Sequence, residues 1–391
     1  METMSVTGHR ENVDVAVVGN GLIGLSTAAH LIRAGMSVSV AQGGETGRAS
    51  LAAAGMLTPA CEYDEWMPLA FLHLLQTGLD YYPEFLRSAD RGNEEVGFRQ
   101  CDFTLLDLHE RDESLKERMG WMPGLGFDCV WLDAHEVIPL EPHLSPAAFR
   151  GGIRIRDQAV VDPIALWELL SAEVGFGART IHSGGVVGID ERGERLVVAT
   201  GDGGRIAADR VVLAAGSWSA QVAALIGLDL PVVPVKGQMV QLAGPPGMVN
   251  SVVFMPSGGC GSIVERRPGS YVVGTSEEYL APTPDNTAGV IGAILSRLTA
   301  VSPAASDWVI ERTWSGFRPM TSDELPIIGQ TADARVVAAT GHHRNGVLLA
   351  PLTGKLVLDL LRDAPPARGL DLHLYRYGRP LRPPTRFASK Y

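Results

Sequence analysis

Three glycines near the N-terminus have the spacing of a phosphate-binding turn. Gly19, Gly21 and Gly24 follow the apolar run Val13–Val18 and precede a helical pattern that stops at Gly35. In a strand–turn–helix unit, such glycines permit the tight turn, the approach of a pyrophosphate and close packing of the helix on the strand. The helix start adds N–H groups and a positive dipole end. The pattern therefore predicts a dinucleotide site, against the alternative of a chance glycine turn.

The residues after the second expected strand, 37–41, bear on which dinucleotide binds. Gln42 stands where such folds usually place an acidic residue on the adenosine ribose. An amide can still exchange hydrogen bonds with a diol, without the charge-assisted strength of a carboxylate. The small residues of 48–57 would let the backbone lie against a flat ring such as a flavin. A close helix contact made by the alanines explains them equally, so both interpretations stay open.

The size and charge of the chain limit its architecture and its partners. A chain of 391 residues can bury a large core, and we expect two lobes. The net charge of −11 disfavours nucleic acid or an anionic membrane as a partner. The four cysteines are far apart and show no CxxC spacing, which is typical of a reduced protein without a structural metal. Residues 1–12 lack the apolar region of a signal peptide, and no apolar stretch is long enough to span a membrane, so we expect a cytoplasmic protein.

The nucleotide-binding signals lie in separated blocks of the chain. The β-branched runs near 211–215 and 335–341 read as further buried strands, and aromatic, alternating segments lie between the blocks. The predicted fold is α/β, a Rossmann-like domain of the glutathione-reductase type interleaved with an α+β substrate domain on a mostly antiparallel sheet. The expected boundaries are 1–90, 150–230 and 310–391 for the nucleotide-binding domain, and 91–149 and 231–309 for the substrate domain.

Four motifs carry a resemblance to one family. They are Ala49–Leu57, Pro234–Met239, Gly316–Gly329 and Gly341–Pro351, and they spread over most of the chain. Together they resemble the D-amino acid oxidase superfamily of FAD-dependent enzymes, and within it most closely the bacterial glycine oxidases of thiamine biosynthesis. The resemblance implies FAD as the cofactor. Related methylamino acid oxidases tether flavin through a cysteine near position 316, and Gly316 here implies noncovalent FAD.

The resemblance also implies which residues contact the cofactor. The first implied contacts lie at the phosphate turn, at the adenosine ribose and on the segment beside it. Further along the chain come residues next to the flavin, one residue at adenine, and a loop around the pyrimidine side of the flavin ring. In chain order the implied cofactor-binding residues are Gly19, Gly21, Leu22, Ile23, Gly24, Gln42, Gly43, Ala49, Ser50, Ala54, Gly55, Met56, Val186, His342, His343, Arg344, Asn345, Gly346, Val347 and Leu348.

Two arginines match the family's pocket arginines. The resemblance implies that Arg318, in Gly-Phe-Arg-Pro, clamps a substrate carboxylate and that Arg344, in His-Arg-Asn-Gly, adds a contact or shapes the pocket. A guanidinium suits this role because its fork binds both carboxylate oxygens at once. The alternative for either is an ordinary salt bridge. The adjacent His342 and His343 have no carboxylate or cysteine partner at ligand spacing, so we expect no metal site.

One departure from the family bears on the substrate. The alignment places Ser262 where glycine oxidases carry a tyrosine that holds the substrate, and Met56 and Ser262 complete the expected substrate contacts beside the two arginines. Losing a phenol opens volume, so we expect the core reaction to survive with a shifted or bulkier amine. The glycine-rich 257–262 segment before it is either a mobile lid or only a loop.

Three functions remain open at this point. The first is an FAD-dependent oxidase of glycine or a related small amino acid, with O2 as acceptor and hydrogen peroxide as product. The second is an oxidase or dehydrogenase of the same fold that acts on a larger or N-substituted amine, or that passes electrons to an acceptor other than O2. The third is a nicotinamide reductase or a nucleotide-binding protein without redox activity. The resemblance to glycine oxidases also implies a homo-oligomer, a tetramer by analogy.

Overall fold

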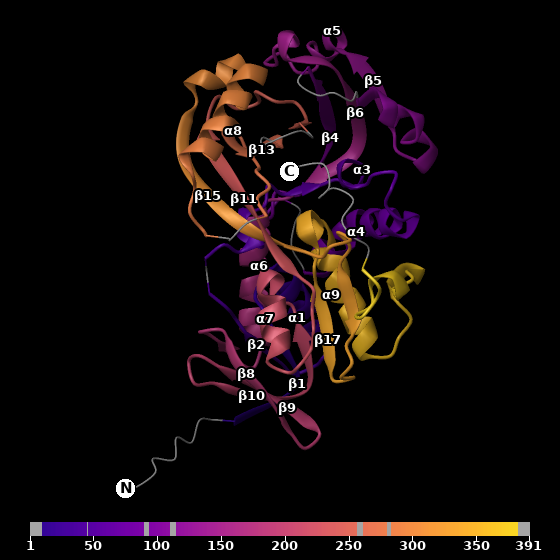
Figure 1. Cartoon of the computed structure of the whole chain (residues 1–391), viewed down its shortest axis with the longest axis vertical. Coiled ribbons are helices and arrows are strands. Elements are labelled where there is room, and N and C mark those ends of the chain that lie inside the picture. The colour runs from indigo at the N-terminus through magenta and orange to yellow at the C-terminus, as the bar shows by residue number, and fades with distance from the viewer. Residues whose placement is uncertain are drawn as a thin grey trace. The chain divides into compact units, whose positions relative to one another are not determined.

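The chain forms two compact units, each built from separated stretches of sequence. The computed structural model describes residues 10–44, 46–89, 94–109, 115–255, 261–279 and 283–381. Unit 1 comprises residues 1–50, 167–234 and 318–391, and unit 2 comprises 51–166 and 235–317. Each unit is centred on its own β-sheet (Figure 1).

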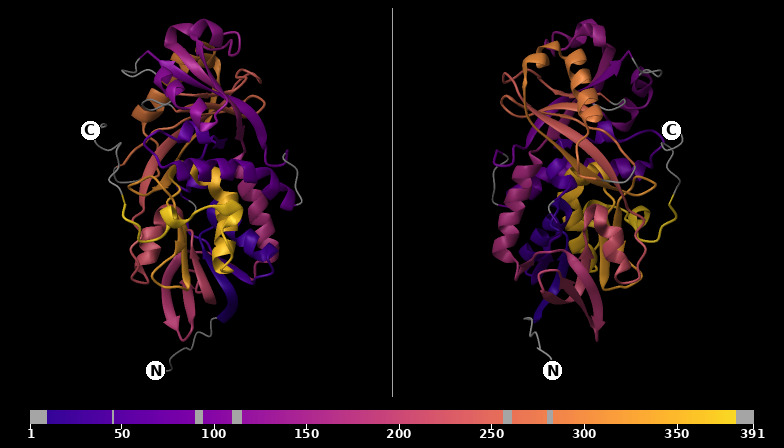
Figure 2. Two further views of the ribbon diagram at one scale, coloured as in Figure 1. Left: turned by 90° about the vertical axis from the view of Figure 1, so that its right-hand side faces the viewer. Right: turned by 60° about the vertical axis from the view of Figure 1, so that its left-hand side comes forward.

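The eight-stranded sheet of unit 1 is largely parallel. Strand β1 lies in its interior and pairs in parallel with β10 and with β2, while β10 and β2 pair in parallel with β17 and β7. The antiparallel strands are β16, on β17, and the β8–β9 hairpin, which continues from β10 (Figure 2). The strands are β1 (Arg10–Val18), β2 (Val38–Ala41), β7 (Ile181–His182), β8 (Val186–Arg192), β9 (Arg195–Thr200), β10 (Arg205–Leu213), β16 (Ile327–Gln330) and β17 (Val336–Thr340).

The helices of unit 1 follow the parallel strands and cover the sheet. Gly354 allows α9 to approach α1, because a Cβ there would lie 2.6 Å from the Ser26 carbonyl oxygen. Alternate residues of β10 and β17 pack instead into an apolar cluster with Ala223 of α7 and Leu196 of the hairpin. The helices are α1 (Leu22–Arg33), α2 (Ala49–Ala52), α6 (Pro163–Gly177), α7 (Ser219–Ala224) and α9 (Gly346–Leu361), with 3-10 turns η4 (Gly216–Trp218), η6 (His343–Asn345), η7 (Ala367–Gly369) and η8 (His373–Tyr375).

The nine-stranded sheet of unit 2 is mostly antiparallel. The antiparallel pairs include β11 with β14, β13 with β14 and β4 with β6, whereas β12 pairs with β4 in parallel. The strands are β3 (Met56–Leu57), β4 (Arg99–Leu108), β5 (Cys129–Asp133), β6 (Phe149–Val160), β11 (Val233–Ala243), β12 (Val252–Phe254), β13 (Ser262–Arg267), β14 (Ser270–Gly274) and β15 (Val309–Met320). The parallel sheet of unit 1 and this second sheet confirm the predicted fold class.

One apolar face of the second sheet packs against α8. Ile294, Leu298 and Val301 of this helix share a buried cluster with alternate strand residues such as Val240 and Val273. Burial of these side chains is the main favourable term for the sheet–helix contact. The helices of unit 2 are α3 (Pro59–Glu62), α4 (Leu69–Ser88), α5 (Ala134–Val137) and α8 (Ala288–Val301), with 3-10 turns η1 (Leu115–Gly120), η2 (Pro123–Leu125), η3 (Pro146–Ala148) and η5 (Pro303–Asp307).

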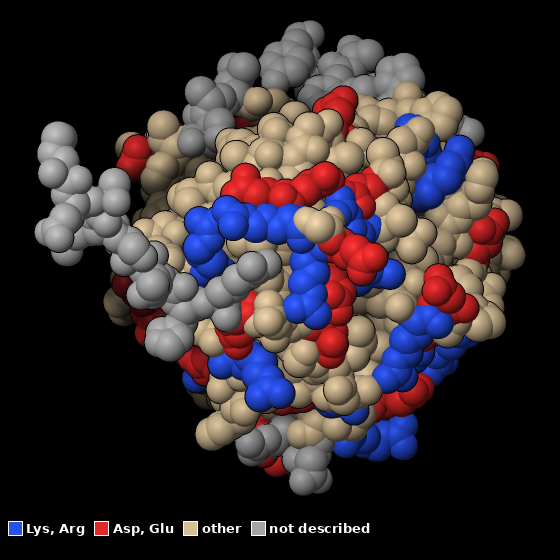
Figure 3. Space-filling model, turned by 90° about the horizontal axis from the view of Figure 1, so that it is seen from below, with Lys and Arg blue, Asp and Glu red and all other residues tan. Residues whose placement is uncertain are grey.

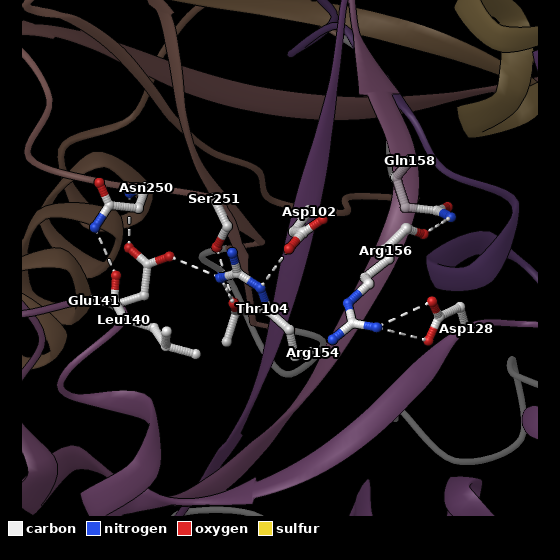
Figure 4. Close-up of polar contacts among 10 residues, drawn as sticks. All are labelled: Asp102, Thr104, Asp128, Leu140, Glu141, Arg154, Arg156, Gln158, Asn250 and Ser251. Carbon is white, nitrogen blue, oxygen red and sulfur yellow. Dashed lines mark hydrogen bonds and ion pairs between the residues drawn. The ribbon is translucent and has the colours of Figure 1, made fainter.

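A buried charge network ties β6 to its neighbours in unit 2 (Figure 4). Arg154 donates to Asp102 and Thr104 of β4 and to the buried Glu141, at 3.0, 2.9 and 3.0 Å. The second oxygen of Glu141 accepts from the backbone N–H of Asn250 at 2.8 Å. Arg156, two residues along β6, instead makes an exposed ion pair with Asp128. The network holds β4, β6 and the residues before β12 together.

The observed division of the chain differs from the expected domain boundaries, mainly over two stretches, with smaller shifts at 231–234 and 310–317. We assigned 51–90 and 150–166 to the nucleotide-binding domain, whereas the compact units group residues 51–166 with unit 2. The physical reason is strand pairing. β3 and β6 belong to the nine-stranded sheet, where β6 pairs with both β4 and β5.

Charges of both signs are mixed on the surface. Figure 3 shows Lys and Arg side chains beside Asp and Glu side chains on one face. Ion pairs such as Arg195–Asp209 on unit 1 are of this kind. Within the described ranges, no helix has both the length and the apolar character needed to cross a membrane.

Candidate active site

The carboxyl ends of four parallel strands meet at one edge of the first sheet. β1, β2, β10 and β17 run in the same direction, so the residues that follow them gather at that edge. Ligands of open α/β sheets bind at this edge, where the chain connections diverge to either side. Here the residues that follow the strands include Gly19, Gln42, Ala214 and Gly341.

The glycine turn after β1 has no room for side chains. A Cβ on Gly19, whose φ is +116°, would lie 2.2 Å from the Ala214 carbonyl oxygen. A Cβ on Gly24 would lie 2.0 Å from the Gly19 carbonyl oxygen. The first contact sets β1 against β10, and the second sets α1 against the turn. Both positions therefore require glycine, and the start of α1 lies directly beside the strand end.

The start of α1 is capped from a distant segment. Gly21 is its N-cap residue, and Leu22 and Ile23 form its first turn. The hydroxyl of Ser50, in α2 beside Ala49, accepts from the Leu22 backbone N–H at 2.9 Å. Ser50 thus lies at the helix N-terminus, where an anion is favoured by the dipole and by backbone N–H groups.

Gln42 lies at the end of β2 next to the glycine turn. Its side-chain oxygen Oε1 accepts from Nδ2 of Asn20 at 2.8 Å. The Asn20 carbonyl in turn accepts from the Trp167 indole at 2.7 Å. Gly43, which follows, is exposed, and its carbonyl accepts from Arg48.

Val186 lies shortly after β7, the strand next to β2 in the sheet. It begins β8 and pairs with Thr200 of β9. The preceding strand, β7, pairs in parallel with β2. The Gly185 N–H donates to the Gln42 carbonyl at 2.9 Å, so the segment leading to Val186 is held at the Gln42 position.

The loop after β17 leads into α9 and is largely buried. His342 is fully buried and contacts Thr353 through Nε2 at 3.0 Å, and burial lowers its pKa to about 3, so the ring is neutral. His343 has a φ of +48° and lies 3.7 Å from Glu324. The Asn345 oxygen Oδ1 is buried and has no hydrogen-bond partner among the described residues. Gly346, Val347 and Leu348 form the first turn of α9, whose N–H groups point toward this loop.

Arg318 and Arg344 lie on segments that the backbone joins. Met320, near the end of β15, forms an isolated antiparallel bridge with His342. Arg318 is two residues before Met320, and Arg344 is two residues after His342, so both fall on the same side of the bridge. Both arginines are half-buried. The bridge thus joins the two segments that carry the predicted arginines, which β16 and β17 separate in the sequence.

Ala54, Gly55 and Met56 lie in unit 2, on a segment whose carbonyls are held by side chains. The carbonyl of Ala52 accepts from the Trp314 indole at 3.2 Å, and those of Ala53 and Ala54 accept from the Arg266 guanidinium. Gly55 has a φ of +90°, and a Cβ there would lie 2.0 Å from the Val161 carbonyl oxygen. Met56 starts β3 and pairs with Val160.

Ser262 belongs to the sheet of unit 2. It is buried at the start of β13, and its hydroxyl donates to the Gly274 carbonyl at 3.1 Å. Of the glycine-rich segment before it, residues 257–260 lie outside the described residues. Lys236 is buried as well, and its ammonium donates to the Asp285 carbonyl at 2.5 Å.

Sequence reasoning missed the residues that hold the predicted ones in place. Asn20 and Trp167 fix the ribose end, and Arg266 and Trp314 fix the Ala52–Ala54 carbonyls. A polar residue between two turn glycines was a usable signal for Asn20. The other three lie far along the chain from their partners, and no local pattern identifies them.

The described residues fit a bound FAD. The glycine turn holds the N-terminus of α1 directly beside the end of β1, where backbone N–H groups suit a pyrophosphate. The loop before α9 offers a second helix N-terminus together with the unpaired Asn345 oxygen, an acceptor suited to a ring N–H. No group of three or more His, Cys, Asp or Glu side chains suited to a metal ion occurs in the described part of the chain.

Comparison with known proteins gives relatives over nearly the whole chain. The glycine oxidase of Geobacillus kaustophilus is 33% identical over 355 residues, which cover 89% of this chain and 92% of that protein. Its crystal structure superposes with a TM-score of 0.86 at 30% identity, over 95% of this chain and all of that one. Iminodiacetate oxidase from Chelativorans sp. BNC1 superposes with a TM-score of 0.81 at 26% identity, over 93% and 98% of the two chains.

A longer relative contains a second activity. The bifunctional protein ThiO/ThiG of Synechocystis sp. is 32% identical over 358 residues, which cover 90% of this chain and only 52% of that protein. The chain therefore spans about half the length of this relative. The model of the FAD-dependent oxidoreductase family named DAO matches residues 14–360. The match decides for FAD over a nicotinamide cofactor, and the chain belongs to the DAO family of FAD-dependent oxidoreductases.

Proposed function

We propose that the chain oxidises the amine of glycine or a related small amino acid with O2 as electron acceptor. The products are an imine, hydrolysed to a 2-oxo acid and ammonia, and hydrogen peroxide. The observation that supports the proposal is the Met320–His342 bridge, which joins the segments that carry Arg318 and Arg344. Glycine oxidases among the relatives support the substrate class.

The two arginines bind and orient the substrate. Arg318 takes the carboxylate through its planar fork, and Arg344 adds positive charge on the same side of the bridge. Half-buried guanidinium groups favour an anionic ligand. Anchoring the acid group fixes the α-carbon, which is the atom that reacts.

The chemical step needs little from the side chains. Bound FAD would supply the acceptor for the hydride that leaves the substrate α-carbon. The N-terminus of α9 and the loop before it supply N–H groups and a positive dipole end, which stabilise negative charge on the pyrimidine side of the ring. His342 is neutral, so this loop gains no charge from it.

The resemblance to glycine oxidases implies that Ser262 stands where that family has a substrate-holding tyrosine. The Ser262 hydroxyl bonds to the Gly274 carbonyl, and a serine is much smaller than the tyrosine that the family places there. This observation favours a second candidate, an oxidase or dehydrogenase of the same fold that takes a larger or N-substituted amine. For either kind of substrate, the proposal keeps the substrate carboxylate bound to the arginines.

A spectral titration tests the proposal. The purified yellow protein is mixed without oxygen with glycine, sarcosine, D-alanine and larger amino acids, and loss of the flavin absorbance is followed. We expect at least one of them to bleach the flavin and readmitted air to restore it with release of peroxide. Bleaching by larger amines alone would select the second candidate, and reduction of a dye without peroxide would select the dehydrogenase. A protein that no amino acid reduces would overturn the proposal.

A further inference from the structure

The ribose end of the nucleotide site is built on a pair of amides. Asn20 is only 7% exposed, and its Nδ2 donates to Oε1 of Gln42 at 2.8 Å. The Trp167 indole holds the Asn20 backbone from the other side. The Gln42 backbone donates to the His182 carbonyl and accepts from the Gly185 N–H, each at 2.9 Å. Both members of the pair are thus fixed in place.

The hydrogen bond from Asn20 determines which way the side-chain amide of Gln42 points. Because Oε1 is occupied by Asn20, the Nε2 group, with two N–H donors, remains for a ligand. Among the described residues, Nε2 of Gln42 has no acceptor. A carboxylate at this position would only accept, and it would carry a negative charge.

Charged groups of both signs lie around the Asn20–Gln42 pair. Arg48 donates to the Gly43 and Gly44 carbonyls at 3.3 and 3.0 Å, and its guanidinium lies over the Trp167 ring. The carboxylate of Asp202, on the loop after β9, accepts from the N–H groups of Ser183 and Gly204 and from the Thr200 hydroxyl. His182, whose Nδ1 is 3.6 Å from Asp202, lies between that carboxylate and Glu11.

We propose that the Asn20–Gln42 pair makes the ribose end a neutral site of hydrogen-bond donors, which binds adenosine nucleotides that carry a 2′-phosphate as well as those that do not. Asn20 is the positioning residue, and Gln42 makes the contact. In dinucleotide folds an acid at this position selects a free 2′-hydroxyl, whereas donors and a nearby arginine accommodate a 2′-phosphate. The inference concerns nucleotide binding and does not depend on the proposed oxidation.

Competition with FAD tests the inference on the full chain freed of its cofactor. Binding of FAD is followed by its fluorescence, with ADP or adenosine 2′,5′-bisphosphate as competitor. In the unmodified chain we expect the two competitors to bind within about threefold of each other, since the Asn20–Gln42 pair carries no charge. Gln42→Glu should weaken the bisphosphate relative to ADP on the order of 30-fold, because a carboxylate then faces the 2′-phosphate.

A second variant isolates the role of Asn20. In Asn20→Asp the new carboxylate accepts from Gln42 and turns the amide, so we expect the bisphosphate to weaken relative to ADP. Asn12→Asp adds the same charge at the exposed start of β1 and serves as the matched control, in which the ratio stays unchanged. If the unmodified chain already rejects the bisphosphate as strongly as Gln42→Glu, the inference is wrong. Should Asn20→Asp fail to fold, the Gln42→Glu comparison decides alone.

Discussion

Met320 and His342 form an isolated antiparallel bridge that joins the end of β15 to the loop before α9. Arg318 lies two residues before Met320 on β15, and Arg344 lies two residues after His342 in the 3-10 turn η6. The His342 ring is in turn held by Thr353 of α9. The placement of the two arginine-bearing segments therefore depends on the bridge and on this contact.

The first prediction concerns the carboxylate clamp. Arg318→Ala should lower kcat/KM for amino acids roughly 10²- to 10³-fold, because a charge-assisted pair to the substrate is lost. Most of the loss should be in KM, since the contact forms before the chemical step. Steady-state kinetics with the best substrate of the spectral titration measure it. Arg156→Ala, which removes an exposed arginine, is the control. Unchanged turnover in Arg318→Ala would show that another group binds the acid.

The second prediction concerns the glycine turn. Gly24→Ala places a methyl group 2.0 Å from the Gly19 carbonyl oxygen, so α1 must move away from the strand end. We expect the purified variant to contain much less FAD, measured as flavin absorbance per protein. Gly175→Ala in α6 is the control, because a Cβ there has no atom within 4 Å. Equal flavin content in the two variants would contradict a pyrophosphate site at this turn.

Much of this edge of the sheet follows from local sequence. The glycines, the strand before them and the helix after them occur within a few residues, and their steric demands are local. The four motifs likewise identify FAD as the cofactor and the family to which the chain belongs. The parallel sheet with an interleaved antiparallel one was also predicted, although the expected boundaries left β3 and β6 outside the second sheet.

The contacts that fix the site could not be predicted in this way. Arg266 reaches the Ala53 and Ala54 carbonyls across more than two hundred residues of chain. Its position depends on the β13–β14 register, which shifts between Glu265 and Arg267. Such a register results from the packing of the whole sheet, and no short pattern reports it.

The third prediction concerns this guanidinium. Arg266→Met should release the Ala53 and Ala54 carbonyls, and we propose that the segment from Ala54 to Met56 contacts the flavin. The expected result is a changed flavin spectrum and a lower flavin reduction potential, since a buried positive charge is also lost. Redox titration with reference dyes measures it. Arg267→Gln, at a side chain that is 70% exposed, is the control. Identical potentials in both variants would limit Arg266 to a structural role.

The fourth prediction concerns pH and stability. His342 has a pKa near 3 when folded against 6.5 when exposed, so the unfolded chain binds the extra proton as the pH falls below 6.5. Between pH 7.5 and 5.5, this histidine alone should reduce the free energy of unfolding by about 1.4 kcal/mol. Urea unfolding at both pH values measures this free energy. Its decrease from pH 7.5 to pH 5.5 should be smaller by that amount in His342→Gln than in the unmodified chain. The exposed His109→Gln should not change the pH dependence.

The fifth prediction compares two arginines on one strand of unit 2. Arg154→Met leaves the carboxylate of Glu141, which is 1% exposed, and that of Asp102 without their cation. A buried ion pair broken on one side costs about 3–5 kcal/mol, and we expect a loss of stability of that order in urea unfolding. Arg156→Met breaks only an exposed pair and should cost about 0–1 kcal/mol. Because the two substitutions are chemically identical and two residues apart, equal losses would mean that the Arg154 network does not stabilise unit 2.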